Sequence, residues 1–233
     1  MAWQTSGPAY ARSGAVTSTD ASRAFMVGVY RWMFVGLGVT AGVALLTVSS
    51  PALLQMVVRA GWMLWVAQLG LVVVLSFGAQ RLNPALAGAL FLAYAGLNGL
   101  SFSFVFLVYQ LGSLGRVFML TAGTFGALSI YGAVTKRDLS TWGTFLFIGL
   151  FGIVMASIVN LIWPAPALTF VLSCASVLVF GGLTAYDNQK LRAWYQESGG
   201  ANAAGMSING ALRLYLDFIN LFLSLLRLFG RRN

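Results

Sequence analysis

The sequence has no histidine, a single cysteine and only 5 acidic residues among 233. Zinc sites are built mainly from histidine and cysteine, so Cys174, alone in an apolar run, leaves no zinc chemistry and no intramolecular disulfide. Charged residues make up 8% of the chain, whereas about a quarter of an ordinary soluble domain is charged. These absences argue against a soluble metalloenzyme. The basic residues behind the net charge of +9 are scattered singly and do not indicate nucleic-acid binding.

Hydrophobic residues are abundant, at 59% of the chain, and the mean hydropathy is +0.83. They form continuous runs of about 20 residues, the length that a helix needs to cross about 30 Å of hydrocarbon. A membrane β-barrel has shorter, alternating segments instead. We therefore predict an all-α integral membrane protein with seven transmembrane helices in one domain, residues 27–233. The predicted helices are roughly 27–48, 62–80, 85–110, 117–134, 142–163, 167–187 and 209–229.

Two polar stretches stand apart from these runs. Residues 1–26 are rich in Ala, Ser, Thr and Gly and lack the short apolar core and cleavage site of a signal peptide. We predict a mostly disordered tail there. The one long separator between predicted helices, about 188–208, carries Lys190, Arg192 and Glu197.

The basic residues also predict the orientation, because Lys and Arg are enriched on the cytoplasmic side of a membrane. A cytoplasmic N-terminus places eight of them on that side and five on the other, so we predict that orientation. The first group is Arg12, Arg23, Arg31, Arg81, Lys136, Arg137, Lys190 and Arg192, and the second is Arg59, Arg116, Arg227, Arg231 and Arg232. The arginines near the C-terminus argue the other way unless the last segment is re-entrant, so the side of the C-terminus stays open.

The last apolar segment carries a polar stripe. Arg213, Asp217, Asn220, Ser224 and Arg227 follow one another at spacings of four, three, four and three, which places them on one face of a helix. A carboxylate facing lipid costs several kcal/mol, so Asp217 is expected to face the protein interior and to have a partner. That partner is Arg213 one turn earlier, another arginine, or a second acid that shares a proton or a cation.

Asp187 is the only other acid at the end of an apolar run. In the predicted topology it lies near the cytoplasmic surface, whereas Asp217 lies about 15 Å into the last helix. The two meet only if the last helix begins beyond the membrane edge or the preceding one ends below it. A solvated charge at a helix end is an equally good reading of Asp187 alone.

Three motifs carry a resemblance to a known family. They are Ala185-Tyr-Asp-Asn-Gln-Lys190, Leu214-Tyr-Leu-Asp-Phe-Ile-Asn-Leu-Phe222 and Asn98-Gly-Leu-Ser101. Together with the seven-helix pattern they resemble the bacterial branch of the Bax inhibitor-1 (transmembrane Bax inhibitor motif) family. The resemblance implies a central seventh helix wrapped by the other six, and a pH-sensing pair, Asp187 and Asp217, at the cytoplasmic mouth of a calcium-leak path.

The resemblance also assigns Arg81, at the end of the second predicted helix, as a latch that contacts the pair in the closed state. Some members carry an acid within the second helix that contributes to the pathway. No acid lies between Asp20 and Asp138 here, so that contribution is missing.

Such a pair has a clear chemistry. Two carboxylates about 3 Å apart do not both ionise readily, so the pair retains one shared proton. Loss of that proton makes the carboxylates repel each other and attract Arg81 or a cation. Calcium prefers several oxygen ligands, and two aspartates supply only part of that shell. A weak, transient calcium site suits permeation, and we expect no other cofactor.

Two other function classes fit parts of the pattern. Intramembrane aspartyl proteases use two membrane aspartates but have glycines just before the second, where this chain has Tyr215 and Leu216. We therefore do not expect an enzyme. A non-transporting regulator that binds a membrane quality-control protease, with residues 1–26 as the contact, is the alternative. The favoured prediction is a pH-sensitive calcium leak in a bacterial inner membrane.

Overall fold

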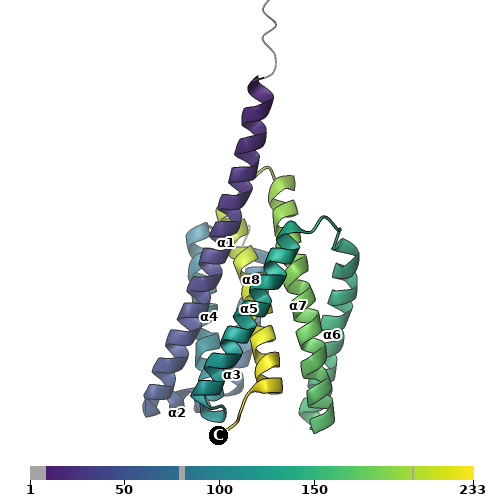
Figure 1. Cartoon of the computed structure of the whole chain (residues 1–233). Helices are drawn as coiled ribbons and strands as arrows, with labels where there is room; N and C mark the ends of the chain where they lie inside the picture. Colours follow the sequence, from purple (N-terminus) through teal and green to yellow (C-terminus); the bar gives the residue numbers. More distant parts are fainter. Residues whose placement is uncertain (1–8, 79–81, 201) are drawn as a thin grey trace, which may run out of the picture.

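The computed structural model describes residues 9–78, 82–200 and 202–233, with only the backbone given for 9–19, 77 and 78. Within these ranges the chain is helical, with one isolated β-bridge between Tyr109 and Arg232. The helices are α1 (Ala9–Ser49), α2 (Pro51–Ala60), α3 (Trp62–Gly78), α4 (Pro84–Val108), α5 (Leu111–Val134), α6 (Ser140–Ile162), α7 (Pro166–Glu197) and α8 (Ala203–Phe229). Figure 1 shows them as a bundle with roughly parallel axes, except for the short α2.

The prediction of an all-α membrane protein is confirmed, but the count of seven helices is not, because the described residues form eight. The additional helix is α2. Ser50 Oγ accepts the Leu53 N–H at 3.5 Å and Pro51 occupies the first turn, so a new helix starts directly after α1. Gly61, with φ of 41°, ends it, and the axis then bends by 76° into α3. Local capping residues thus form a helix where the hydropathy pattern indicated only a separator.

Length and composition qualify five helices to cross a membrane, or six if α2 and α3 together form one broken span. The five are α1 from Asp20, α4, α5, α6 and α7. α8 is not among them, although it runs along the bundle in Figure 1. Its polar side chains lower its hydropathy, and they are accommodated because the helix is buried by its neighbours.

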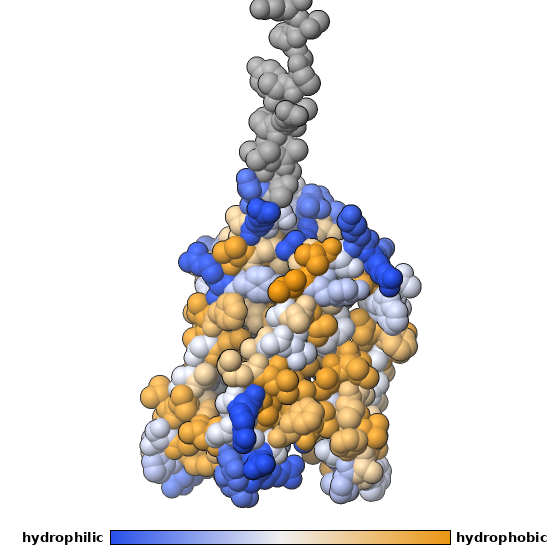
Figure 2. All heavy atoms as spheres, in the orientation of Figure 1, coloured by the Kyte–Doolittle hydropathy of each residue, from blue (hydrophilic) through white to orange (hydrophobic). Residues whose placement is uncertain are grey.

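α8 is the most buried helix in the described part of the chain. Eighteen of its 27 residues are buried, and it packs against α1, α3, α4, α5 and α7. α6 is the opposite case, because it buries only Gly143 and Leu146 and packs mainly against α7. Apolar side chains cover the middle of the molecule in Figure 2, and hydrophilic ones gather at its two ends. This is the surface expected of a protein embedded in lipid.

The two ends of the described chain lie at opposite ends of the bundle, since α1 begins at the end away from the C-terminus (Figure 1). The last segment therefore traverses the bundle and does not return on itself. Which end faces the cytoplasm stays a prediction. The disordered tail was predicted for residues 1–26, but α1 begins at Ala9, so residues 9–26 are helical. Residues 1–8 lie outside the described part.

The prediction of a long separator at about 188–208 is wrong. α7 continues to Glu197 and α8 begins at Ala203, so most of that stretch is helical. The connecting turn has positive φ at Gly199 (61°), Gly200 (79°) and Asn202 (52°), a conformation that glycine adopts without strain. Polar composition indicated a loop here, but it marks instead the ends of two helices that extend past their apolar runs.

Candidate functional site

The α7 motif distributes its side chains among several neighbours, because consecutive helical residues point about 100° apart. Asn188 is fully buried; it accepts a hydrogen bond from the Tyr30 hydroxyl of α1 and donates to Ser129 Oγ of α5 at 3.2 Å. Gln189 accepts the Leu139 N–H at 2.9 Å and donates to the Arg137 carbonyl at 2.9 Å. α7 is thereby fixed to α1, to α5 and to the α5–α6 connection.

Two close approaches fix α7 further. A Cβ added at Gly132 of α5 would lie 2.1 Å from the Ala185 carbonyl oxygen, so the two helices meet there backbone to backbone. A Cβ added at Gly143 of α6 would lie 2.6 Å from the Tyr186 ring. Gly132 therefore requires glycine, whereas a larger residue at Gly143 would require the Tyr186 ring to shift. They set the height and rotation of the segment that presents Asp187.

Asp187 and Asp217 border the same hollow, which we call the polar cavity. Its volume is about 640 Å³, and its walls come from α6, α7 and α8. The lining residues are Gly143, Thr144, Phe147, Leu150, Val154, Phe180, Leu183, Tyr186, Asp187, Arg213, Leu216, Asp217 and Asn220. Its titratable and charged side chains are thus two carboxylates, one guanidinium and one phenol. The walls also hold an amide, a hydroxyl and otherwise apolar groups.

The two carboxyl groups are nearly removed from the surface, with Asp187 9% and Asp217 5% exposed. Each lies within electrostatic range of Arg213, and Asp217 is within range of Asp187. Among the described residues, Asp217 Oδ2 has no hydrogen-bond partner. Arg213 donates its Nε–H to Asn209 Oδ1 at 3.3 Å. A buried acceptor without a donor is costly, so the geometry favours a proton, a water or a cation at this oxygen.

The ends of α7 and α8 explain how both acids come to border the polar cavity. Asp187 lies ten residues before the end of α7, roughly 15 Å, and Asp217 lies fourteen residues after the start of α8, roughly 21 Å. The two acids were expected to meet only if the last helix began beyond the membrane edge or the preceding one ended below it. α8 begins at Ala203, six residues before the predicted start of its apolar run.

The residues of the polar stripe of α8 differ in how far they are buried. Asp217 and Ser224 are buried, Asn220 is half-buried, and Arg213 and Arg227 are exposed. Asn220 Nδ2 donates to the Leu216 carbonyl at 2.8 Å, and Ser224 Oγ donates to the Asn220 carbonyl at 2.7 Å. Only Arg213, Asp217 and Asn220 line the polar cavity. Arg81, predicted as the latch, lies outside the described residues.

Tyr215 points away from the polar cavity. Its ring is fully buried against Phe91 and Tyr94, and its hydroxyl lies 2.7 Å from Thr40 Oγ1 of α1. Thr40 Oγ1 is also 2.9 Å from the Ala95 carbonyl, which ties α1, α4 and α8 together. In the other motif, Ser101 Oγ accepts a hydrogen bond from Gln68 at 2.7 Å. These contacts are structural, and they hold α8 so that Asp217 faces the opposite side.

This arrangement does not resemble a permanent metal site. The described residues contain no cluster of three or more Asp, Glu, His or Cys side chains. A cation in the polar cavity would be held by two carboxylates, with the Asn220 side-chain amide oxygen and the hydroxyls of Thr144 and Tyr186 as further side-chain oxygens within its walls.

Sequence reasoning missed Asn188, Gln189 and Thr40, which carry the inter-helix hydrogen bonds around the site. Asn188 and Gln189 follow Asp187 directly in the motif, and two amides at the end of an apolar run were a usable signal. Thr40 lies in an apolar run with nothing beside it to single it out.

Comparison with known proteins agrees with the three motifs. The family described as inhibitor of apoptosis-promoting Bax1 matches residues 22–233. The chain is 46% identical over 215 residues to a protein of Deinococcus radiodurans, covering 92% of this chain and 93% of the relative. It is 44% identical over 230 residues to the inner membrane protein YbhL of Escherichia coli, covering 96% and 98%. It is 40% identical over 239 residues to a protein of Caulobacter vibrioides, covering 95% and 96%. The chain therefore belongs to the Bax inhibitor-1 family.

Proposed function

We propose that the protein is a pH-sensitive calcium leak of a bacterial inner membrane, with its N-terminus in the cytoplasm. Asp187 and Asp217 form its proton-controlled gate, and α8 acts as the central helix. One observation carries the proposal: two buried carboxyl groups border one cavity, and an oxygen of Asp217 has no partner among the described residues. The inner-membrane location is supported by YbhL, the Escherichia coli relative named for it.

The gate works through the number of protons on the pair. With one proton shared, the pair carries a single negative charge, Arg213 of the same cavity balances it, and the path is closed. As the pH rises the proton is lost, and two buried carboxylates then border the same cavity. Their repulsion is relieved by a calcium ion entering between them. Calcium flux is therefore expected to rise with pH.

Of the three helices that line the polar cavity, α6 is the one that moves when the carboxylates repel each other. It packs mainly against α7, whereas α7 is hydrogen bonded to α1, α5 and the α5–α6 connection and α8 packs against five helices. Repulsion at the pair therefore displaces α6 most readily. Because two aspartates complete only part of a calcium shell, the ion binds weakly and leaves again, as permeation requires. We assign no catalytic role to the pair.

The test is calcium flux into dye-loaded proteoliposomes between about pH 6 and pH 8. Wild type is expected to show flux that rises with pH, and Asp217→Asn a flux that no longer responds to pH. Asp187→Asn should behave in the same way, and the double variant should add nothing, because a shared proton needs both carboxylates.

Asp138→Asn is the matched control. Asp138 is exposed in the α5–α6 connection, where the Ser140 N–H donates to its Oδ1 at 2.8 Å and lowers the pKa of that carboxyl. It therefore stays ionised over the tested range, and its replacement should leave the pH response intact. Equal flux from empty, wild-type and Asp217→Asn vesicles would exclude a leak. That outcome would favour the regulator of a membrane protease, whose binding should then depend on residues 1–26.

A further inference from the structure

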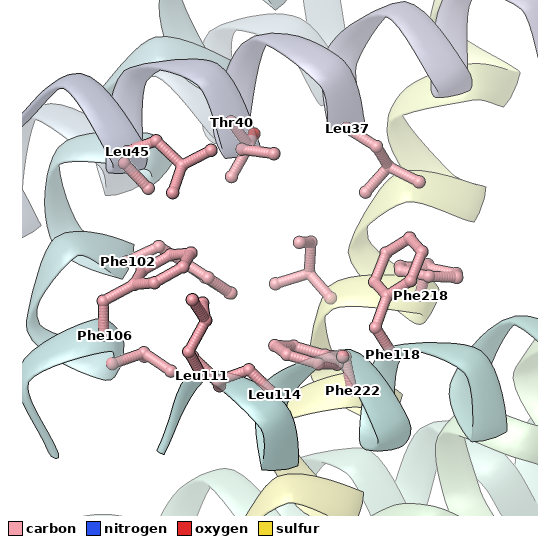
Figure 3. A pocket seen from close by; sticks show the side chains of 15 residues that line it. Leu37, Thr40, Leu45, Phe102, Phe106, Leu111, Leu114, Phe118, Phe218 and Phe222 are labelled. Carbon is pink, nitrogen blue, oxygen red and sulfur yellow. The ribbon is translucent and has the colours of Figure 1, made fainter. Parts of the chain in front are cut away.

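A second hollow lies on the other side of α8, and we call it the apolar crevice. Its volume is about 400 Å³, within the range of about 300–1,000 Å³ typical of ligand pockets. α1 and α5 form its two sides, with α4 and α8 behind them (Figure 3). The lining residues are Leu37, Thr40, Ala41, Ala44, Leu45, Phe102, Val105, Phe106, Leu111, Leu114, Gly115, Phe118, Phe218, Ile219 and Phe222.

The chemistry of the apolar crevice excludes a polar ligand. Fourteen of its fifteen lining side chains are apolar or absent, and the one hydroxyl, of Thr40, already lies within hydrogen-bonding distance of Tyr215 and the Ala95 carbonyl. The rim is open to the outside of the bundle, because Leu45, Leu111 and Phe118 are 45–69% exposed. The medium beside this part of a membrane protein is hydrocarbon. An acyl chain is therefore the occupant that the lining fits.

The crevice lies in one half of the bundle, close to one end. Its α1 residues begin about 6 Å from the end of that helix at Ser49 and continue to about 18 Å, from Leu45 to Leu37. Trp62, Trp65 and Trp163 are exposed at the same end of the bundle, as in an interfacial aromatic belt. A chain lying in the crevice thus has its headgroup at the level of these tryptophans.

Three arginines lie at the same end of the bundle, at or beside the start of α5. Arg116 follows the crevice residue Gly115, and its Nε–H donates to the Gly112 carbonyl at 3.2 Å, which turns the side chain toward the helix end. Arg231 is held at the start of α5, because its N–H donates to Ser113 Oγ at 2.9 Å and its carbonyl accepts the Gln110 N–H at 3.0 Å. Arg232 stacks over the Tyr109 ring with its Cζ 5.9 Å from the ring centre. Among the described residues, this end of α5 carries no acidic side chain to neutralise them.

We propose that the apolar crevice is a binding site for one anionic phospholipid, with an acyl chain between α1 and α5 and the phosphate beside Arg116, Arg231 and Arg232. The lining selects a hydrocarbon chain and the arginines select the negative headgroup. This site lies on the opposite side of α8 from the polar cavity. It does not depend on whether the protein conducts calcium.

Native mass spectrometry of the purified protein, titrated with phosphatidylglycerol or phosphatidylcholine, tests the proposal. Wild type is expected to retain one phosphatidylglycerol in a discrete adduct and to bind phosphatidylcholine more weakly. Gly115→Leu should reduce the adduct roughly tenfold. A Cβ at Gly115 meets no atom within 4 Å, so the leucine fills the crevice without a backbone clash.

Two further variants separate filling of the crevice from damage to the fold. Gly123→Leu is the matched control, because this glycine is on the same helix, is equally open and does not line the crevice. It should bind lipid as wild type does. Replacing Arg116 and Arg232 by Gln should lower binding of phosphatidylglycerol by at least roughly fivefold and leave phosphatidylcholine unchanged. An adduct that survives Gly115→Leu, or equal binding of the two lipids by wild type, would overturn the proposal.

Discussion

The two sides of α8 differ in how tightly their neighbours approach. On the side of the polar cavity, α7 meets α5 backbone to backbone at Gly132 and holds its neighbours through Asn188 and Gln189. On the side of the apolar crevice, α1 and α5 stand apart, and a Cβ at Gly115 meets nothing. The comparison indicates that the two faces of α8 have different surroundings. One face holds Asp217 among closely packed helices, and the face about half a turn away borders a crevice wide enough for an acyl chain.

The largest effect is expected from Gly132→Ala. Its Cβ would lie 2.1 Å from the Ala185 carbonyl oxygen, so α5 and α7 must separate. Overpacking of this kind costs about 3 kcal/mol or more when the obstacle is backbone. Thermal unfolding in detergent measures the loss. Gly115→Ala on the same helix should unfold like wild type, and equal stability of the two variants would contradict the contrast between the sides.

A smaller loss of stability is expected from Asn188→Leu. The leucine leaves the Tyr30 hydroxyl and Ser129 Oγ without their buried partner, which costs about 1–3 kcal/mol. Tyr30→Phe removes one donor only and should cost less. In the double variant the losses should not add, because both act on one hydrogen bond. Full additivity in denaturant titrations would mean that Asn188 acts through packing alone.

The smallest effect is expected from Gly115→Leu on calcium flux. The leucine fills the apolar crevice, whereas Asp187 and Asp217 border the polar cavity on the other side of α8. The pH dependence of flux in proteoliposomes should therefore stay within roughly twofold of wild type. A flattened pH response would show instead that the two sides are coupled through α8.

Hydropathy was enough to predict the long helices, because continuous apolar runs have one stable arrangement in a bilayer. The stripe spacing also placed Asp217 in the protein interior correctly, and the motif that contains Asp187 identified the second acid of the cavity. The first follows from the period of the helix, which is local, and the second from the resemblance to the family. The family assignment rested on the same residues and is confirmed.

What the sequence did not predict depends on capping and on contacts between helices. α2 exists because Ser50 and Pro51 start a helix and Gly61 stops it, which an average over apolar residues does not detect. α7 extends to Glu197 because its last turns pack on the protein, so their polarity was misread as a loop. Asn188 was missed because two of its three partners, Tyr30 and Ser129, come from distant parts of the chain. The predicted role of Arg81 stays a prediction.

The last residues of the chain form a clasp. The Asn233 N–H donates to the Val108 carbonyl at 2.9 Å, and Arg232 forms a β-bridge with Tyr109, which joins the end of α8 to the turn between α4 and α5. This clasp bears directly on protein engineering. A purification tag or reporter fused after Asn233 is attached to a hydrogen-bonded segment and is expected to disturb it. Removal of Arg231–Asn233 leaves the Gln110 N–H and the Val108 carbonyl without these partners.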